Sequence, residues 1–148
     1  MGVVYAPVIG VLYYAAKGQG AFKKESTNEP QPIHVREKRS SKMVVACGRS
    51  CPTAEVEAFL AKVGEYKIVR VGSALKSCLV AEGQADLYVR LGPTSEWDTA
   101  AAQCVVEEAG GAITDTNMQR LRYNTKADLL NPHFFVAGDR SINWSTFL

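Results

Sequence analysis

The sequence lacks the cysteine and histidine patterns on which zinc sites and disulfide frameworks are built. Its 148 residues include four cysteines and two histidines, and no two cysteines form a C-x-x-C pair. His34 and His133 stand far apart in segments expected to be loops, so they do not indicate a zinc site. Cys78 and Cys104 lie in apolar helical patterns and are expected to be buried thiols, which favours a reducing compartment over a disulfide framework.

The chain also has a low net charge and no long apolar run. Lys and Arg number 17 against 15 Asp and Glu, a formal net charge of +2. That balance implies neither a nucleic-acid-binding tail nor an acidic solvating segment. No apolar run approaches the roughly 20 residues that a membrane-spanning helix needs. Hydrophobic residues still make up 47% of the chain, enough to bury the core of about one domain.

Acidic residues do not occur in the patterns that hold two metal ions. The sequence contains no D-x-D and no D-G pair, although a two-metal site needs several converging carboxylates. The only adjacent acidic pair, Glu107–Glu108, is expected near the negative end of a helix. That position is a poor one for a shared metal ion, so the chain alone is not expected to form a two-metal centre.

Alternating apolar patterns predict a layered α/β domain. Strands are expected at 2–8, 10–16, 21–24, 43–47, 66–72, 85–92, 112–115, 120–123 and 134–138, and helices at 53–63, 73–82 and 96–109. We expect the strands near 43–47, 67–72, 85–90 and 112–115 to share one sheet, with the helices packed on it. The segments 112–115 and 120–123 suggest a hairpin, and the basic stretch 34–42 is expected to be an exposed edge or loop.

Two element ends between residues 72 and 90 offer groups that bind anions. A strand runs into Gly72, and Ser73 is expected to open a helix whose free N–H groups attract an anion, with Lys76 one turn further in. On the strand "DLYVRLG", Tyr88 and Arg90 point to the same face, which is expected to be the more open one. The planar fork of arginine suits a phosphate group. On residue types alone, an ordinary helix cap and a solvent-facing polar pair remain equally good interpretations.

The stretch "GPTSEWDTAA" places Asp98 at the start of an alanine-rich helix. Ser95 and Asp98 are close to the capping-box pattern, and an acidic residue in the first turn complements the helix dipole. A carboxylate at a turn into a helix can also hold a divalent cation. On residue types alone, the cap is the stronger interpretation of Asp98.

Taken together, these segments resemble the inositol-monophosphatase superfamily. In that superfamily a G-S segment, an A-x-G-x-x-D-x-Y segment and a W-D-x-A-A segment occur in this order, and "GSALK", "AEGQADLY" and "WDTAA" occur in the same order here. The segments "GVVYAPV", "LVAEGQADLY", "GPTSEWDTAA" and "LLNPHFFV" are most similar to the 3'(2'),5'-bisphosphate nucleotidases of the CysQ type. The likeness extends over nearly the whole chain.

The resemblance implies a layered α/β fold of the sugar-phosphatase type and a Mg²⁺-dependent phosphomonoesterase. The implied substrate is 3'-phosphoadenosine 5'-phosphate, a by-product of sulfur metabolism, which is cleaved to AMP and phosphate. Gly72, Ser73, Lys76 and Arg90 match positions that bind the nucleotide and its non-scissile phosphate. Inositol phosphatases commonly have a glutamate where Arg90 stands, so the arginine favours a substrate with a second phosphate.

The same resemblance changes the interpretation of the helix start. Asp98 matches an aspartate that binds the second Mg²⁺, and Trp97 matches its packing neighbour. Metal binding thereby becomes the stronger interpretation, although one carboxylate oxygen can cap the helix while the other meets the ion. Cys51 departs from the pattern, because the subfamily tends to have a histidine there that helps to line the nucleotide site.

A larger departure is the missing N-terminal part of the superfamily, with its metal-binding glutamate and D-P-x-D-G-T motif. We therefore expect the chain to be a C-terminal part, truncated at its N-terminus. Residues 1–42 would be a β-rich remnant of the N-terminal subdomain, and 43–148 the C-terminal α/β subdomain. The truncation would expose Val4, Val8, Val11 and Leu12 on the first strands, which predicts a homo-oligomer.

The leading functional interpretation is the C-terminal portion of a bisphosphate nucleotidase, inactive alone. One alternative is a non-catalytic truncated relative that binds an anion or a partner protein. Another is an inositol or sugar monophosphatase, which Arg90 disfavours. A nucleotide is the expected ligand, with no nucleic-acid partner and no transmembrane segment. The resemblance also implies a cytoplasmic location, and it is compatible with peripheral contact with the inner membrane.

Overall fold

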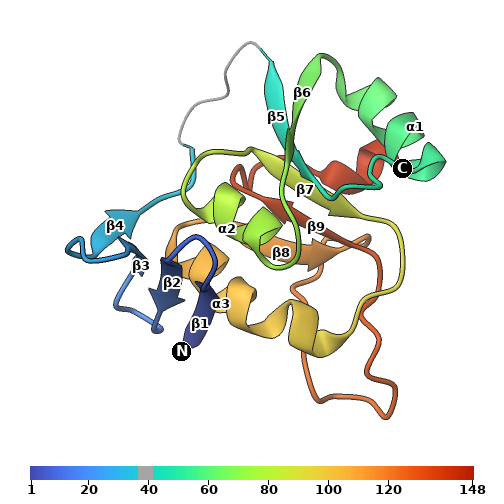
Figure 1. The fold of residues 1–148 in the computed structure, drawn as a ribbon. Coiled ribbons are helices and arrows are strands. Elements are labelled where there is room, and N and C mark those ends of the chain that lie inside the picture. The colour runs from blue at the N-terminus through green and yellow to red at the C-terminus, as the bar shows by residue number, and fades with distance from the viewer. Residues whose placement is uncertain (37–41) are drawn as a thin grey trace.

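A computed structural model describes residues 1–36 and 42–148. The chain begins with a small antiparallel sheet in the strand order β1-β2-β3-β4 (Figure 1). Its strands are β1 (Gly2–Ala6), β2 (Val11–Ala15), β3 (Ala21–Glu25) and β4 (Gln31–Ile33). Glycines with positive φ, among them Gly10 and Gly18, permit the tight turns between the first three strands. The first three strands confirm the prediction, and β4 is a short addition in the segment that was expected to be a loop.

A second sheet has five strands in the order β6-β5-β7-β9-β8. Its strands are β5 (Met43–Cys47), β6 (Tyr66–Arg70), β7 (Leu87–Arg90), β8 (Ala112–Asp115) and β9 (Phe134–Ala137). The pairs β5–β6 and β5–β7 are parallel, and β9 pairs antiparallel with both β7 and β8. Every residue of β5 and β9 is buried, as expected for strands covered on both faces. The prediction that the strands near 43–47, 67–72, 85–90 and 112–115 share one sheet is confirmed.

Helices α1 (Ala54–Val63), α2 (Leu75–Ala81) and α3 (Ala100–Glu108) follow the predicted positions. The Thr53 hydroxyl accepts a hydrogen bond from Val56 N (3.5 Å) and caps α1. The helix expected at 96–109 is divided, because a 3-10 turn, η1 (Glu96–Asp98), precedes α3. A second 3-10 turn, η2 (Trp144–Phe147), ends the chain.

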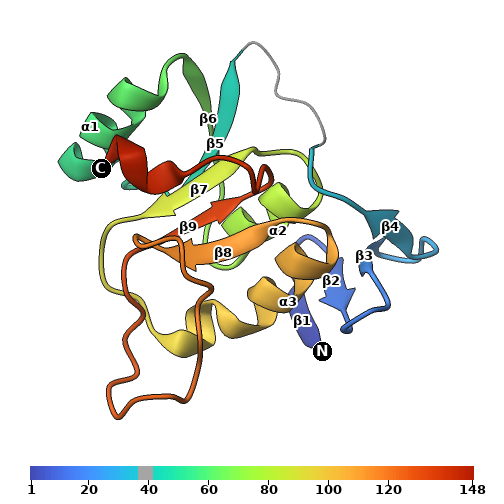
Figure 2. The same cartoon turned by 180° about the vertical axis from the view of Figure 1, so that it is seen from behind.

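The elements stack in four layers (Figures 1 and 2). One apolar cluster joins the inner face of the small sheet, helices α2 and α3, and one face of the five-stranded sheet. A second cluster joins the opposite face of the five-stranded sheet to α1 and η2, and it contains Phe59, Phe135 and Trp144. This layering confirms the α/β fold. The division into subdomains at residue 42 coincides with the boundary between the two sheets but stays a prediction.

The hairpin expected at 112–123 is reduced to a short turn. Residues 120–123 do not form a strand, and β8 pairs with β9. The two segments are joined by the antiparallel bridge between Thr114 and Arg120 and by hydrogen bonds from Asp115 N to Gln119 O (2.8 Å) and from Leu121 N to Ile113 O (3.2 Å). The guanidinium of Arg120 also forms a fork with the Glu107 carboxylate on α3 (2.6 and 2.8 Å), which ties the segment to the helix.

The stretch 34–42 is only partly the exposed loop that its composition suggested. Val35 packs against the first apolar cluster, and Arg36 forms an ion pair with the Asp86 carboxylate (3.1 Å). The same Asp86 oxygen accepts a hydrogen bond from Val44 N (2.6 Å), so the segment is joined to the start of β5. Residues 37–41, which contain the rest of the basic run, lie outside the described residues.

The exposed apolar residues of the first strands differ in part from the expectation. Val8 is exposed as expected, but Val11 is buried, and Val4 packs against the first cluster. The side chains that face solvent are instead Val3 and Tyr5, because strict alternation places them on the outer face of β1. No helix in the described part of the chain is long and apolar enough to span a membrane.

Candidate functional site

Four of the predicted binding residues line one cavity of about 210 Å³, namely Ser73, Lys76, Arg90 and Asp98. They come from the turn before α2, from α2, from the end of β7 and from η1. The expectation that they share one concave region is therefore confirmed as geometry, while their roles stay predictions. Gly72 does not line this cavity and is exposed next to Ser73.

Lys76 is nearly buried, with 9% of its surface exposed. Its ammonium donates a hydrogen bond to Ser73 O (2.8 Å) and lies 5.0 Å from the centre of the Tyr88 ring. Burial lowers the pKa of Lys76 below its usual value, and the nearby charge of Arg90 lowers that pKa further. Perturbed basic groups of this kind are typical of binding sites.

The turn at Ser73 differs from the prediction. Ser73 does not open the helix: it has a positive φ of 54°, and α2 begins at Leu75 after Ala74, with no side-chain cap. The seven-residue α2 therefore brings Lys76 to the cavity rather than serving as a helix-end anion site. The carbonyl of Ser73 is what fixes the lysine side chain.

Arg90 is the last residue of β7, and part of its guanidinium group has no hydrogen-bond partner in the described residues. Its Nη2 donates to Pro93 O (2.9 Å), whereas its buried Nε has no hydrogen-bond partner in the described part of the chain. A buried donor without a partner is costly, and an anion in the cavity would satisfy it. The lining of the cavity thus includes two cationic side chains, Lys76 and Arg90, against one carboxylate, Asp98.

Tyr88 is not on an open face, contrary to the prediction. It is 7% exposed and packs edge-on against Phe134, with ring centres 5.6 Å apart. Burial raises its pKa to about 12, so the phenol stays protonated at neutral pH. Tyr88 therefore serves as a rigid wall of the cavity and as the platform for Lys76.

A second cavity of about 410 Å³ shares Lys76, Tyr88 and Arg90 with the first. Its other lining residues come from the turn after β5 and from the segment after β7; they include Gly48, Ser50, Cys51, Thr53, Leu91 and Pro93. Lys76 and Arg90 therefore line both the 210 Å³ cavity and the 410 Å³ cavity. Cys51, the residue at the position where a histidine was expected, lines the second one.

Asp98 is held by its own turn. Its Oδ2 accepts a hydrogen bond from Ser95 N (2.9 Å), and Asp98 N donates to Ser95 O (2.9 Å), so the predicted capping box is present. Trp97 is 68% exposed, which corrects its expected role as a packed neighbour of Asp98. The turn thus presents an exposed carboxylate at the edge of the cavity.

The residues present fit one ligand of a Mg²⁺ ion but not a complete site. Asp98 alone supplies a carboxylate to the 210 Å³ cavity, and no group of three or more His, Cys, Asp or Glu side chains comes together in residues 1–36 and 42–148. Glu107 is paired with Arg120, and Glu108 accepts hydrogen bonds from Gly18 N and Gly20 N (2.9 and 3.2 Å). Both carboxylates therefore have partners within the chain.

Sequence reasoning missed the residue that positions this turn. The buried amide of Asn131 donates to Thr94 Oγ1 (3.2 Å), Ser95 O (2.8 Å) and Thr99 Oγ1 (3.0 Å), and thereby pins both ends of the turn that contains Asp98. Asn131 belongs to "LLNPHFFV", a segment that carried the resemblance, but nothing in its local pattern points to residues more than thirty positions earlier.

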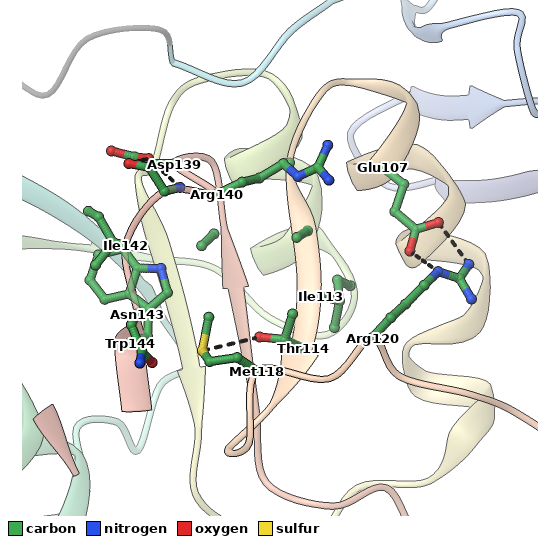
Figure 3. A pocket seen from close by; sticks show the side chains of 14 residues that line it. Glu107, Ile113, Thr114, Met118, Arg120, Asp139, Arg140, Ile142, Asn143 and Trp144 are labelled. Carbon is green, nitrogen blue, oxygen red and sulfur yellow. Dashed lines mark hydrogen bonds and ion pairs between the residues drawn. The ribbon is translucent and has the colours of Figure 1, made fainter. Parts of the chain in front are cut away.

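A larger cavity of about 640 Å³ lies elsewhere, against β8 and the segment before η2. Figure 3 shows Arg120 reaching Glu107 at one side, with Met118 and Ile142 toward the other. None of the predicted binding residues lines it. Size alone therefore does not identify the functional site; the charged groups and the unsatisfied donor at Arg90 favour the smaller cavities.

Comparison with known proteins identifies the family of the chain. Residues 1–143 match the inositol monophosphatase family. The chain is 46% identical over 136 residues to the 3'(2'),5'-bisphosphate nucleotidase CysQ of Salmonella typhimurium, and 45% identical over 137 residues to that of Escherichia coli K12. These alignments cover 92% and 93% of this chain and 54% of each relative.

Solved structures give the same result. CysQ from Bacteroides thetaiotaomicron, described as a bacterial member of the inositol monophosphatase family, aligns with a TM-score of 0.82 at 35% identity. That alignment covers 92% of this chain and 56% of the other. An inositol monophosphatase from Anabaena aligns with a TM-score of 0.71 at 26% identity, over 98% of this chain and 55% of the other.

The chain thus spans about half the length of the curated relatives that it matches. Its family match covers nearly all of its residues, and the strand order, the layers and the W-D-x-A-A turn all lie within the matched region. The resemblance to CysQ-type proteins is confirmed by both comparisons. The chain belongs to the inositol monophosphatase family.

Proposed function

We propose that this chain is the nucleotide-binding, C-terminal portion of a Mg²⁺-dependent 3'(2'),5'-bisphosphate nucleotidase, and that it binds but does not hydrolyse its ligand when alone. The ligand class is an adenosine bisphosphate such as 3'-phosphoadenosine 5'-phosphate. The observation that carries the proposal is the Lys76–Tyr88–Arg90 wall between two adjoining cavities, with an unsatisfied buried Nε on Arg90.

The two cations, Lys76 and Arg90, favour a ligand with two phosphates over a ligand with one. Lys76 provides a compact charge fixed by Ser73 O, and Arg90 provides a planar fork with free donors. One phosphate at this wall is a non-scissile anchor, and the second lies near Asp98. An inositol monophosphate has no second phosphate to neutralise the wall, which is why we favour the nucleotide.

Asp98 contributes one oxygen ligand to a metal in this proposal. When bound, Mg²⁺ would activate a water molecule and stabilise the charge that develops on the phosphoryl group. The remaining carboxylates would come from the half of the family fold that this chain does not cover. Sulfur metabolism and a cytoplasmic location belong to the same proposal and rest on the CysQ-type relatives alone.

A binding titration with 3'-phosphoadenosine 5'-phosphate, without metal, tests the anion site. Arg90→Ala removes a charge-assisted contact worth about 1.5–3 kcal/mol, so affinity should fall roughly ten-fold or more. Arg140→Ala is the matched control, because it removes the same charge at an exposed position beside the unrelated 640 Å³ cavity. Equal affinities for the two variants would contradict the proposed site.

A further inference from the structure

Two cysteines flank the turn that follows β5. Cys47 is the last residue of the strand, and the turn at 48–51 is closed by a hydrogen bond from Cys51 N to Gly48 O (3.4 Å). Arg70 on β6 clamps this turn, because its Nη1 donates to Gly48 O (3.0 Å) and to Cys51 O (2.5 Å). The turn therefore brings Cys51 back to the apolar cluster that contains Cys47.

The two thiols have different environments. Cys47 is 1% exposed, whereas Cys51 is half-buried and lines the 410 Å³ cavity. Burial raises the pKa of Cys47 to about 12, and the adjacent Cys51 thiol, as a hydrogen-bond partner and a nearby charge, contributes to the rise. The pair thus combines a partly exposed thiol with a buried one, and both belong to the same apolar cluster.

We propose that Cys47 and Cys51 form a reversible oxidation site, in which a peroxide converts the two thiols to a disulfide at the wall of the nucleotide cavity. A thiol that is oxidised to a sulfenic acid can condense with a neighbouring thiol to form a disulfide. Cys78 is fully buried and Cys104 packs near Ala15 O (3.5 Å), so neither lines this cavity.

The reaction balances in two steps. Cys51 Sγ attacks one peroxide oxygen, the O–O bond breaks, and a sulfenic acid forms with release of one water. Cys47 Sγ then attacks the sulfur of that sulfenic acid, the S–O bond breaks, and the S–S bond forms with release of a second water that carries the Cys47 proton. The two thiols lose two electrons, and the peroxide gains them. A dithiol reductant reverses the change.

Oxidation should alter ligand binding, a consequence that rests on the proposed function. Cys51 shares its cavity with Lys76 and Arg90, and both thiols lie within electrostatic reach of the Lys76 ammonium. The disulfide draws Cys51 Sγ toward the buried Cys47 and so reshapes the cavity wall. We expect the oxidised chain to bind 3'-phosphoadenosine 5'-phosphate more weakly than the reduced chain.

Peptide mass spectrometry after hydrogen peroxide treatment and alkylation tests the site itself. The expected product is a peptide pair or loop linked through Cys47 and Cys51 that has lost two hydrogens and recovers them with dithiothreitol. Cys78 and Cys104 should remain alkylated thiols. Alkylation of both Cys47 and Cys51 after peroxide treatment, or oxidation of Cys51 to sulfinic acid beside a free Cys47, would overturn the proposal.

Variants separate the two steps. Cys47→Ser should leave a sulfenic acid on Cys51 that dimedone labels, and Cys51→Ser should leave Cys47 unoxidised. Cys104→Ser is the matched control and should still form the disulfide. Nucleotide titrations of the oxidised and reduced chain then test the consequence: disulfide formation with unchanged affinity would overturn the link to the cavity. Absence of nucleotide binding in the reduced chain would instead contradict the proposed function and leave the oxidation result standing.

Discussion

Lys76 and Arg90 place two positive charges at one cavity, although the charge of Arg90 lowers the pKa of Lys76 and so disfavours its charged state. Lys76 is also nearly buried, and removing its charge from water destabilises the folded chain even before a ligand binds. Such an arrangement is unfavourable for stability alone and becomes favourable when an anion is bound. The pair is therefore better explained by binding than by folding.

The lowered pKa of Lys76 predicts a pH dependence of anion binding. As pH rises from neutral toward 10.5, Lys76 loses its proton earlier than an ordinary lysine, so phosphate affinity should decrease within that window. In the absence of anion the free energy of unfolding should rise over the same window, because the unfolded chain binds the extra proton. Calorimetric titration with inorganic phosphate across this range measures the first effect.

Lys76→Arg is the control for this titration. Arginine keeps its charge throughout the window, so the variant should bind phosphate with little dependence on pH. The same decline in affinity for both proteins would show that another group causes it and would contradict the role assigned to Lys76.

The strands and helices were largely predictable, because their signals are local. The short apolar run of β5 and the 3-and-4 spacing of Val56, Phe59 and Leu60 in α1 each require only neighbouring residues. The pairing of β8 was not predictable, since it depends on where β9 lies and on the attachment of Arg120 to Glu107. Local periodicity specifies an element but not its partner.

In the candidate site, too, local features were predictable and features that depend on distant contacts were not. The side chains that line it were found from residue types and the resemblance, and four of them do lie together. The position of Ser73 in a left-handed turn, the burial of Tyr88 and the support of the Asp98 turn by Asn131 were missed. The burial of Tyr88 against Phe134 and the support by Asn131 depend on contacts between segments distant in sequence, which local patterns do not reveal.

The close approach of three elements at Gly111 gives a prediction about stability. A Cβ there would lie 2.8 Å from Ala137 O and 3.0 Å from side-chain atoms of Val106 and Val35. Gly111→Ala should therefore push the start of β8 away from β9 and α3 and lower the free energy of unfolding by about 1–3 kcal/mol. Urea denaturation followed by circular dichroism measures the change.

Gly48→Ala is the matched control, since a Cβ at Gly48 meets nothing within 4 Å and its φ is not positive. Its effect on the unfolding free energy should stay within about 0.5 kcal/mol. Equal stability of the two variants would show that the packing of α3 against β8 yields more easily than the structure indicates.

At the scale of the whole molecule, the uncovered outer face of the small sheet is the main feature. On this face Val3 and Tyr5 are 47% and 60% exposed, and in the turn after β1 Val8 and Ile9 are 97% and 61% exposed. Large exposed apolar patches tend to associate, so we expect the isolated chain to form oligomers. Light scattering coupled to size exclusion should show a mass that increases with concentration.

A double variant, Tyr5→Lys with Val8→Lys, should shift this equilibrium toward the monomer. Leu129→Lys is the control, because Leu129 is also 47% exposed but lies outside the small sheet. A strictly monomeric wild-type chain over a wide concentration range would contradict the expectation, as would an equal effect of the control.

The central claim is that this chain holds an anion site without a complete metal centre. Asp98 is one carboxylate, and Mg²⁺ requires near-octahedral oxygen coordination and dehydrates reluctantly. The direct test is a phosphate-release assay on the purified chain with 3'-phosphoadenosine 5'-phosphate and saturating Mg²⁺. We predict negligible release under conditions in which the nucleotide is bound. Robust release that Asp98→Asn abolishes would show a complete metal site in this chain and contradict the account.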